Sequence, residues 1–313
     1  MTAPVLSVLI VTWNCRTLIG PCLDHLFASR FAEPMEVVVV DNLSKDGTAD
    51  AIRARPEAIT LIEPGENLGF GRGNNLAAEH ARGDYLLLLN PDAYLTDPEA
   101  LPRLLAALRA GEATGLGAVA PRLVNPDGSH QIGDGGYAPT PGNVMRHVGL
   151  VSRLVPGAKG FYVNHPALMA RERIAVDWLA ATCLLVTRRA FEAVKGFDPR
   201  FFMYGEDVDL GIRLGQAGQA LALLPPIAVV HLQGATQRVD PDAVHVSTGW
   251  IDAIFALHRG EGWQPRASRW MIGTTMAVGF GARSLFYAGR GQHGRKRAGA
   301  MLRYARHGWA ARR

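Results

Sequence analysis

The sequence predicts a doubly wound α/β domain, because short apolar strands alternate with helical segments along residues 5–92. Each predicted strand is a run of β-branched residues or leucines, which is typical of parallel strands buried on both faces. Polar residues follow three of these strands directly. Ligands of such sheets bind beyond the carboxyl ends of the strands, so these polar residues are predicted to converge on one site.

The first half of the chain supplies most of this pattern. Predicted strands cover residues 5–12, 36–40, 59–62 and 85–89, and predicted helices cover residues 17–29, 49–55 and 74–82. The polar clusters at strand ends are Thr12-Trp13-Asn14, Asp41-Asn42 and Asn90-Pro91-Asp92. We expect all three at one edge of the sheet.

The second half is less regular. Residues 125–160 are rich in glycine and proline and predict a long loop over the site. Strands are predicted at residues 178–187 and 227–231, and helices at residues 188–194 and 205–215. The last of these helices would carry Glu206 and Asp207 in its first turn.

The composition predicts a globular protein in a reducing compartment. With 313 residues, 48% hydrophobic and 19% charged, the chain is an ordinary globular protein that buries a large core. Its N-terminus has neither a basic region nor a cleavage site, so we expect no signal peptide. Cys15, Cys22 and Cys183 form no C-x-x-C pair and predict buried thiols in a reducing compartment, with no zinc site.

Charge divides the chain unevenly. Residues 259–313 contain twelve Arg or Lys residues and one acid, Glu261, whereas residues 1–258 contain 21 basic and 27 acidic residues. The body is therefore mildly acidic and the tail strongly basic, although the whole chain has a net charge of +5.

Three acidic residues, Glu206, Asp207 and Asp209, follow the aromatic run at residues 201–204. Neighbouring carboxylates repel one another, and an apolar setting raises their pKa values further. A carboxylate with a raised pKa suits general base catalysis. The alternative is a solvated helix start, because acidic side chains also stabilise the first turn of a helix.

Two more carboxylates and a histidine are candidates for ligand binding. Asp92 follows a run of leucines and can hold a divalent ion, although Asn90-Pro91-Asp92 is also good turn chemistry. Asp41 can accept hydrogen bonds from a nucleotide, or can belong to a turn and helix cap with residues 44–47. His231 ends a strand and can bind a metal, but a lone histidine is also commonly structural, and spacing alone cannot place it beside Asp92.

A glycine-rich segment at residues 67–75 precedes a helix and suggests backbone N–H groups near an anion, with Arg72 adding charge. It matches neither a dinucleotide fingerprint nor a P-loop, because the third glycine and the Gly-Lys-Ser/Thr are missing.

Together these motifs resemble a family 2 glycosyltransferase of the GT-A fold, nearest to its bacterial rhamnosyltransferase-like branch. The matching segments are Ser7–Asn14, Val40–Asn42, Asn67–Gly71, Asn90–Asp92 and Gly205–Asp209. The resemblance implies a glycosyltransferase domain over residues 1–258, with a nucleotide-binding half at 1–124 and an acceptor half at 125–258. Residues 259–313 would form a basic, partly apolar helical tail.

The resemblance also implies roles for individual residues. Asp207 would be the catalytic base, with Glu206 beside it. Asp92 would take the second acidic position of the family's DxD motif and bind Mg²⁺ or Mn²⁺ with His231, while Asn90 occupies the first position, so the metal site rests on fewer charges. Asp41 would hold the nucleobase. The full set of expected substrate-binding residues is Thr12, Asn14, Asp41, Asn42, Asn67, Gly69, Arg72, Asn74, Asn90, Trp178 and Tyr204, with core packing as the alternative for Trp178.

The tail bears on the acceptor. Residues 271–288 are apolar but include three glycines and Arg283, which makes them borderline for a membrane span of about 20 residues. The basic residues and aromatic residues that follow suit an amphipathic segment on an anionic membrane, whereas two packed helices with solvated arginines are the alternative. No nucleic-acid motif accompanies the charge. We expect a peripheral protein on the cytoplasmic face of the inner membrane and a saccharide or lipid-linked saccharide acceptor.

Two other classes of protein compete with this interpretation. A sugar-phosphate nucleotidyltransferase would also bind a metal and a nucleotide, but usually carries a Gly- and Arg/Lys-rich loop where this chain has Trp13-Asn14-Cys15-Arg16. A non-catalytic saccharide-binding protein would have no need of Asp207. For the donor, dTDP-L-rhamnose follows from the branch alone, with UDP-sugars as alternatives.

Overall fold

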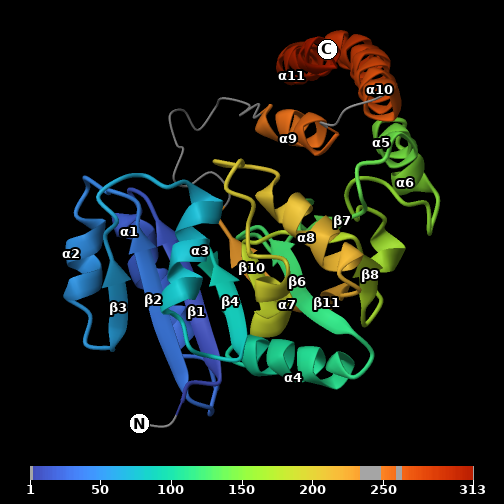
Figure 1. Cartoon of the computed structure of the whole chain (residues 1–313). Helices are drawn as coiled ribbons and strands as arrows, with labels where there is room; N and C mark the ends of the chain where they lie inside the picture. The colour runs from blue at the N-terminus through green and yellow to red at the C-terminus, as the bar shows by residue number, and fades with distance from the viewer. Residues whose placement is uncertain (1–2, 233–247, 259–262, 313) are drawn as a thin grey trace. The chain divides into compact units, whose positions relative to one another are not determined.

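The computed structural model describes residues 3–232, 248–258 and 263–312 and contains a mixed sheet of nine strands (Figure 1). The strand order is β3-β2-β1-β4-β10-β6-β11-β5, and β8 pairs with β11. The strands are β1 (Leu6–Thr12), β2 (Met35–Asp41), β3 (Ile59–Ile62), β4 (Tyr85–Leu89), β5 (Ala93–Tyr94), β6 (Leu116–Val124), β8 (Ile174–Val176), β10 (Cys183–Thr187) and β11 (Ala220–His231). Two shorter strands are β7 (Gly135–Gly136) and β9 (Trp178–Leu179).

The predicted parallel half of the sheet is confirmed. β3, β2, β1 and β4 pair in parallel, with Thr12 of β1 opposite Asp41 of β2. Leucines 86–89 of β4 are almost completely buried, as their continuous apolar run predicts. β10 lies antiparallel between β4 and β6, which makes the whole sheet mixed.

Helices pack along this sheet, α3 against β1 and β2, and α4 against β6, β10 and β11. The helices of this part are α1 (Arg16–Phe27), α2 (Thr48–Arg53), α3 (Phe70–His80), α4 (Ala100–Glu112), α7 (Arg188–Ala193) and α8 (Glu206–Gln216). The predicted helix at 74–82 begins four residues early, at Phe70, because Gly69 caps it and the glycines that follow are helical. Cys15, Cys22 and Cys183 are buried free thiols, as predicted.

Two predictions of local structure were wrong. Residues 125–160 are not one loop, because Thr140 accepts a hydrogen bond from the Asn143 N–H and starts a helix there. That helix is α5 (Pro141–Val148), and α6 (Val151–Leu154) follows it. The strand predicted at 178–187 is interrupted, since residues 180–182 separate β9 from β10.

The chain divides into two compact units, Met1–Gly135 with Met169–Arg238, and Gly136–Leu168 with Val239–Arg313. The described part of the second unit contains α5, α6, the short 3₁₀ turn Pro166–Leu168, α9 (Gly249–Leu257), α10 (Trp263–Ala288) and α11 (Gly291–Ala311). α10 and α11 pack together. The predicted domain bounds, 1–258 with halves at 1–124 and 125–258 and a tail at 259–313, stay predictions.

None of the helices within the described residues, α10 included, is both long enough and apolar enough to cross a membrane.

Candidate active site

The ends of β1 and β2 form one polar cluster. The Asp41 carboxylate accepts hydrogen bonds from the Thr12 hydroxyl at 2.8 Å, the Ser44 hydroxyl at 2.6 Å and the Ser44 N–H at 3.0 Å. The Asn14 side chain, at a left-handed φ of 51°, accepts from the Lys45 N–H at 2.9 Å. The structure thus brings Thr12, Asn14 and Asp41 together as predicted, and it fixes Asp41, 2% exposed, as a buried acceptor.

Asn42 fastens the glycine-rich segment to the end of β2. Its side-chain carbonyl accepts from the Leu68 N–H at 3.2 Å, and its amide donates to the Gly69 carbonyl at 3.1 Å. The Gly69 N–H donates to the Asn67 side chain at 2.9 Å. The N–H groups of Leu68 and Gly69 are therefore bonded within the protein, and the expected contact of the segment with an anion stays a prediction.

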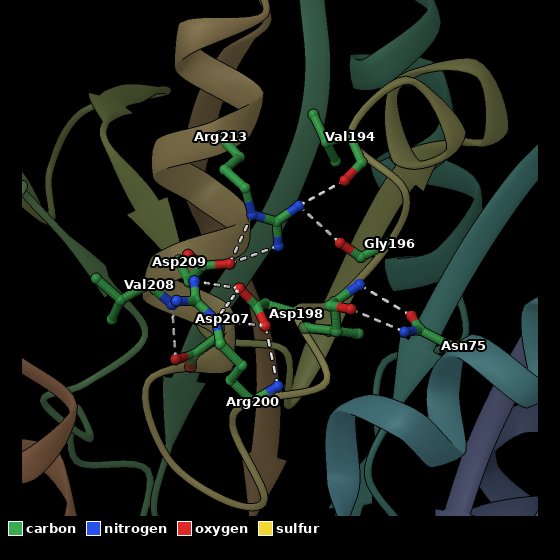
Figure 2. A network of polar contacts seen from close by, with 10 residues as sticks. Asn75, Val194, Gly196, Asp198, Arg200, Asp207, Val208, Asp209 and Arg213 are labelled. Carbon is green, nitrogen blue, oxygen red and sulfur yellow. Dashed lines mark hydrogen bonds and ion pairs between the residues drawn. The ribbon is translucent and has the colours of Figure 1, made fainter. Parts of the chain in front are cut away.

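The same segment supports the acidic cluster, which the sequence did not indicate. The Phe70 N–H donates to the Phe202 carbonyl at 3.1 Å, and a Cβ on Gly69 would lie 2.4 Å from that carbonyl oxygen. The Asn75 side chain bonds both the N–H and the carbonyl of Phe197 at 2.8 Å (Figure 2). Only glycine at position 69 allows residues 197–206 to approach α3 this closely.

Other predicted residues of this segment have ordinary surroundings. Asn74 is buried and donates to the Phe70 carbonyl at 3.0 Å. Arg72 is exposed, 3.7 Å from the Glu66 carboxylate. Substrate binding by Asn42, Asn67, Gly69, Arg72 and Asn74 stays a prediction.

The three acids of the cluster have different environments at the start of α8. Asp209 is paired with Arg213, whose guanidinium lies 2.6 and 2.5 Å from the Asp209 carboxylate (Figure 2). Arg213 also donates to the carbonyls of Val194 and Gly196 at 2.7 and 2.8 Å. Asp209 is thus a structural residue, because it holds the arginine that ties α8 to the segment before Phe197.

Asp207 and Glu206 are not paired in this way. Asp207 is half-buried and accepts from the Val208 N–H at 2.8 Å. Glu206 is buried, and one of its carboxylate oxygens has no hydrogen-bond partner among the described residues. Burial raises the pKa of both groups, and the charge of Asp207 raises the pKa of Glu206 further. A carboxylate pair of this kind can accept a proton from a bound hydroxyl.

The predicted pair Asp92 and His231 does come together. β5 pairs with β11 so that His231 lies opposite Ala93, next to Asp92. The Nε2 atom of His231 is 3.4 Å from the Asp92 carboxylate, and Asp92 is only 6% exposed. A hydrogen bond of 2.5 Å joins Nδ1 of His231 to the side-chain oxygen of Gln131, a residue that the sequence analysis missed.

These residues fit a divalent cation only in part. A carboxylate and an imidazole are suitable ligands, and the buried side-chain oxygen of Asn90 has no hydrogen-bond partner in the described chain. Within residues 3–232, 248–258 and 263–312, however, no three His, Cys, Asp or Glu side chains are grouped as a metal site. A cation held here would need further oxygen ligands from a bound substrate.

The two aromatic candidates differ. Trp178 is buried, and a Cβ on Gly211 of α8 would lie 2.6 Å from the Trp178 Cα, so this strand packs tightly on α8. Packing, the alternative interpretation of Trp178, accounts for its burial. Tyr204 is exposed, with a left-handed φ of 68°, directly before Gly205 and the acidic cluster. Substrate contact by either residue stays a prediction.

Fold and site define a glycosyltransferase of the GT-A type. The family model "Glycosyl transferase family 2" matches residues 7–141. The N-acetylglucosaminyl-diphospho-decaprenol L-rhamnosyltransferase of Mycobacterium tuberculosis is 34% identical over 297 residues, which covers 88% of this chain and 91% of that protein. The chain therefore belongs to glycosyl transferase family 2.

One further relative and one solved structure are also similar to this chain. The O-antigen chain rhamnosyltransferase WbaN of Salmonella anatum is 23% identical over 83% of this chain and 78% of its own length. Among solved structures, a mannosyltransferase of Pyrobaculum calidifontis, in complex with GDP-mannose and Mn²⁺, has a TM-score of 0.58 at 19% identity, covering 99% of this chain and 86% of that one. This last match confirms the predicted fold.

Proposed function

We propose that the protein is an inverting glycosyltransferase that moves L-rhamnose from dTDP-L-rhamnose to a hydroxyl of a lipid-linked saccharide during cell-surface polysaccharide synthesis. The observation that carries the proposal is the contrast within one helical turn: Asp209 forms an ion pair with Arg213, whereas Asp207 has no such pair and is half-buried with a raised pKa. The name of the mycobacterial relative, which includes both rhamnose and a polyprenyl-linked acceptor, supports this donor and this acceptor class.

In the proposed reaction Asp207 accepts the proton of the acceptor hydroxyl, and the acceptor oxygen then attacks the anomeric carbon. The bond to the donor diphosphate breaks in the same displacement, which inverts the anomeric configuration. Glu206 stays protonated beside Asp207, because burial and the neighbouring charge both disfavour its ionised form. The pair therefore carries one negative charge, which leaves Asp207 free to act as the base.

Asp92 and His231 are the proposed ligands of Mg²⁺ or Mn²⁺, together with the donor diphosphate. When bound, the cation would offset the charge that the leaving diphosphate gains. Asp41 is the proposed acceptor for the nucleobase, with Thr12 and Asn14 around it. Its carboxylate already accepts three hydrogen bonds, so it is held in place before a donor arrives.

Attachment to an anionic membrane surface suits the second unit and a lipid-linked acceptor. On α10, Met271, Val278, Leu285 and Phe286 are 46%, 68%, 79% and 58% exposed. Their spacing places them within one face of the helix. The opposite face is buried through Ile272, Met276 and Phe280. We name the exposed residues Met271, Val278, Leu285 and Phe286 the α10 stripe.

The positive charge of α10 and α11 also favours binding to an anionic membrane. α10 and α11 contain eight Arg or Lys residues and no acidic residue. The Arg290 guanidinium, just after α10, lies 3.9 Å from the centre of the Phe286 ring. Apolar side chains flanked by cations bind the headgroup region of anionic bilayers.

A vesicle-flotation experiment tests this attachment. The double variant Val278→Glu with Leu285→Glu should lose binding to vesicles that contain phosphatidylglycerol. The control Gln264→Glu with Ala310→Glu makes the same charge change at exposed positions outside the α10 stripe and should bind nearly as well. Equal loss in both variants would show that net charge alone drives binding and would refute a role for the stripe.

The donor is tested with a panel of nucleotide sugars, Mn²⁺ and a polyprenyl-diphosphate-linked N-acetylglucosamine acceptor. We expect a mass gain of one deoxyhexose with dTDP-L-rhamnose and much less product with UDP-sugars. Formation of a nucleotide sugar from a sugar phosphate would instead identify a nucleotidyltransferase. Binding of a donor without turnover would identify a saccharide-binding protein.

A further inference from the structure

A hairpin after β6 carries a chain of directional hydrogen bonds. Residues 123–131 turn back at Asn125-Pro126-Asp127-Gly128, and the Gln131 N–H donates to the Leu123 carbonyl at 2.9 Å. β6 runs parallel to β11, with Val124 opposite Val230. The hairpin therefore leaves the sheet next to the strand that ends at His231.

The donor-to-acceptor direction of these hydrogen bonds is set at Asp127 and Ser129. The Ser129 hydroxyl donates to the Asp127 carboxylate at 2.6 Å, so its oxygen can only accept from the Asn125 amide, at 2.9 Å. The side-chain oxygen of Asn125 must then face the other way, where it accepts from the Gln131 amide at 3.0 Å. Each bond fixes the orientation of the next side chain.

Gln131 fixes the direction of the hydrogen bond to the His231 ring in the same way. Its amide also donates to the His231 carbonyl at 3.2 Å, so its side-chain oxygen faces the ring and accepts from Nδ1 at 2.5 Å. A carbonyl oxygen cannot donate, and Nδ1 therefore carries the proton. In a neutral ring Nε2 then presents a lone pair, 3.4 Å from the Asp92 carboxylate.

We propose that Gln131 is a positioning residue that holds His231 as the Nδ1–H tautomer, so that Nε2 faces Asp92 as a ready metal ligand. This inference rests on the cation site proposed at Asp92 and His231. Histidine ligands generally donate their second ring N–H to an oxygen, which fixes both the tautomer and the ring orientation. Gln131 is 6% exposed and anchored at both ends of its amide, as such a role requires.

Two readouts test the proposal on the full chain, and neither is enzymatic activity. In metal-free protein labelled with ¹⁵N-histidine, at a pH where the ring is neutral, long-range ¹H–¹⁵N correlation spectra should show the ring proton of His231 on Nδ1, with the signal assigned by His231→Gln. A neutral ring with its proton on Nε2 would overturn the inference. In Gln131→Met the acceptor is lost, and the Nδ1–H preference should be lost with it.

Mn²⁺ affinity in the presence of dTDP, measured by electron paramagnetic resonance, is the second readout. Gln131→Met should weaken binding about 10- to 100-fold. Gln131→Glu keeps an acceptor oxygen and should bind within a few-fold of the wild type. The control His130→Gln changes the same hairpin at a side chain that bonds Asp134, not His231, and should leave the affinity unchanged.

The outcomes separate the two claims. If Asp92→Asn and His231→Gln bind Mn²⁺ as the wild type does, the proposed cation site itself is wrong. If those variants lose binding and folded Gln131→Met keeps it, the cation site stands and the role of Gln131 is refuted. Thermal unfolding of each variant identifies any loss that comes from misfolding.

Discussion

Asp207 and Asp209 lie two residues apart in α8, and replacing each by asparagine should affect different properties of the protein. Asp207→Asn keeps the side-chain volume but removes the proton acceptor. Asp209→Asn keeps one acceptor oxygen but breaks the ion pair with Arg213. Asp207→Asn should therefore lose turnover and keep its fold, whereas Asp209→Asn should lose stability.

The magnitudes follow from the contacts. Loss of a positioned general base costs about 10²- to 10⁴-fold in turnover. The Asp209–Arg213 pair has two contacts, at 2.6 and 2.5 Å, between side chains that are 12% and 25% exposed. Loss of hydrogen bonds between charged groups costs about 1.5–3 kcal/mol of the free energy of unfolding, which is about a 10- to 150-fold change in the unfolding equilibrium.

The assay combines turnover at saturating donor with the midpoint of urea unfolding for both variants. Asp207→Asn should unfold at or slightly above the wild-type midpoint, because a partly desolvated charge is removed. Full turnover in Asp207→Asn would refute its role as the base. A loss of turnover in Asp209→Asn as large as that in Asp207→Asn, without loss of stability, would refute the division of roles.

Three further predictions concern the same region. Because the pKa of Asp207 is raised, the transfer rate should begin to fall on acidification well above pH 3.9, which is about the ordinary aspartate pKa. Initial rates measured across pH would contradict this if they fell only near that value. The folded-state pKa of Glu206 is raised, so the contribution of Glu206 to stability is complete below its unfolded pKa and lost as pH rises through its folded pKa. The free energy of unfolding of Glu206→Gln should therefore exceed that of the wild type by about 1–3 kcal/mol at alkaline pH and equal it at acid pH. Gly69→Ala should cost more free energy of unfolding than Gly65→Ala by about 1–3 kcal/mol, because both glycines have a φ near 80° but only the Cβ at position 69 would meet a backbone oxygen; equal losses would show that the contact with Phe202 is unimportant.

Much of the architecture around Thr12 and Asp41 was predictable from local pattern. Continuous apolar runs identify β1, β2 and β4, and a parallel sheet necessarily aligns their carboxyl ends, which brings Thr12 beside Asp41. The helix that carries Glu206 and Asp207 also begins where the sequence predicts. These inferences needed only contacts between neighbouring strands and helices.

Long-range contacts were not predictable in this way. Asp92 meets His231 because the two-residue strand β5 pairs with β11, and so short a strand has no periodicity to read. Gln131 was overlooked because residues 125–160 were interpreted as one loop. The turn residues Asn125-Pro126-Asp127-Gly128 were the available signal, since they are typical of a tight turn between two paired segments.

The anomeric configuration of the transferred sugar tests the central claim most directly. The product made from dTDP-L-rhamnose and the lipid-linked acceptor would be isolated, and its anomeric configuration measured by the one-bond ¹³C–¹H coupling at the anomeric carbon. A single displacement assisted by Asp207 predicts the configuration opposite to that of the donor. A product that retains the donor's configuration would contradict this account.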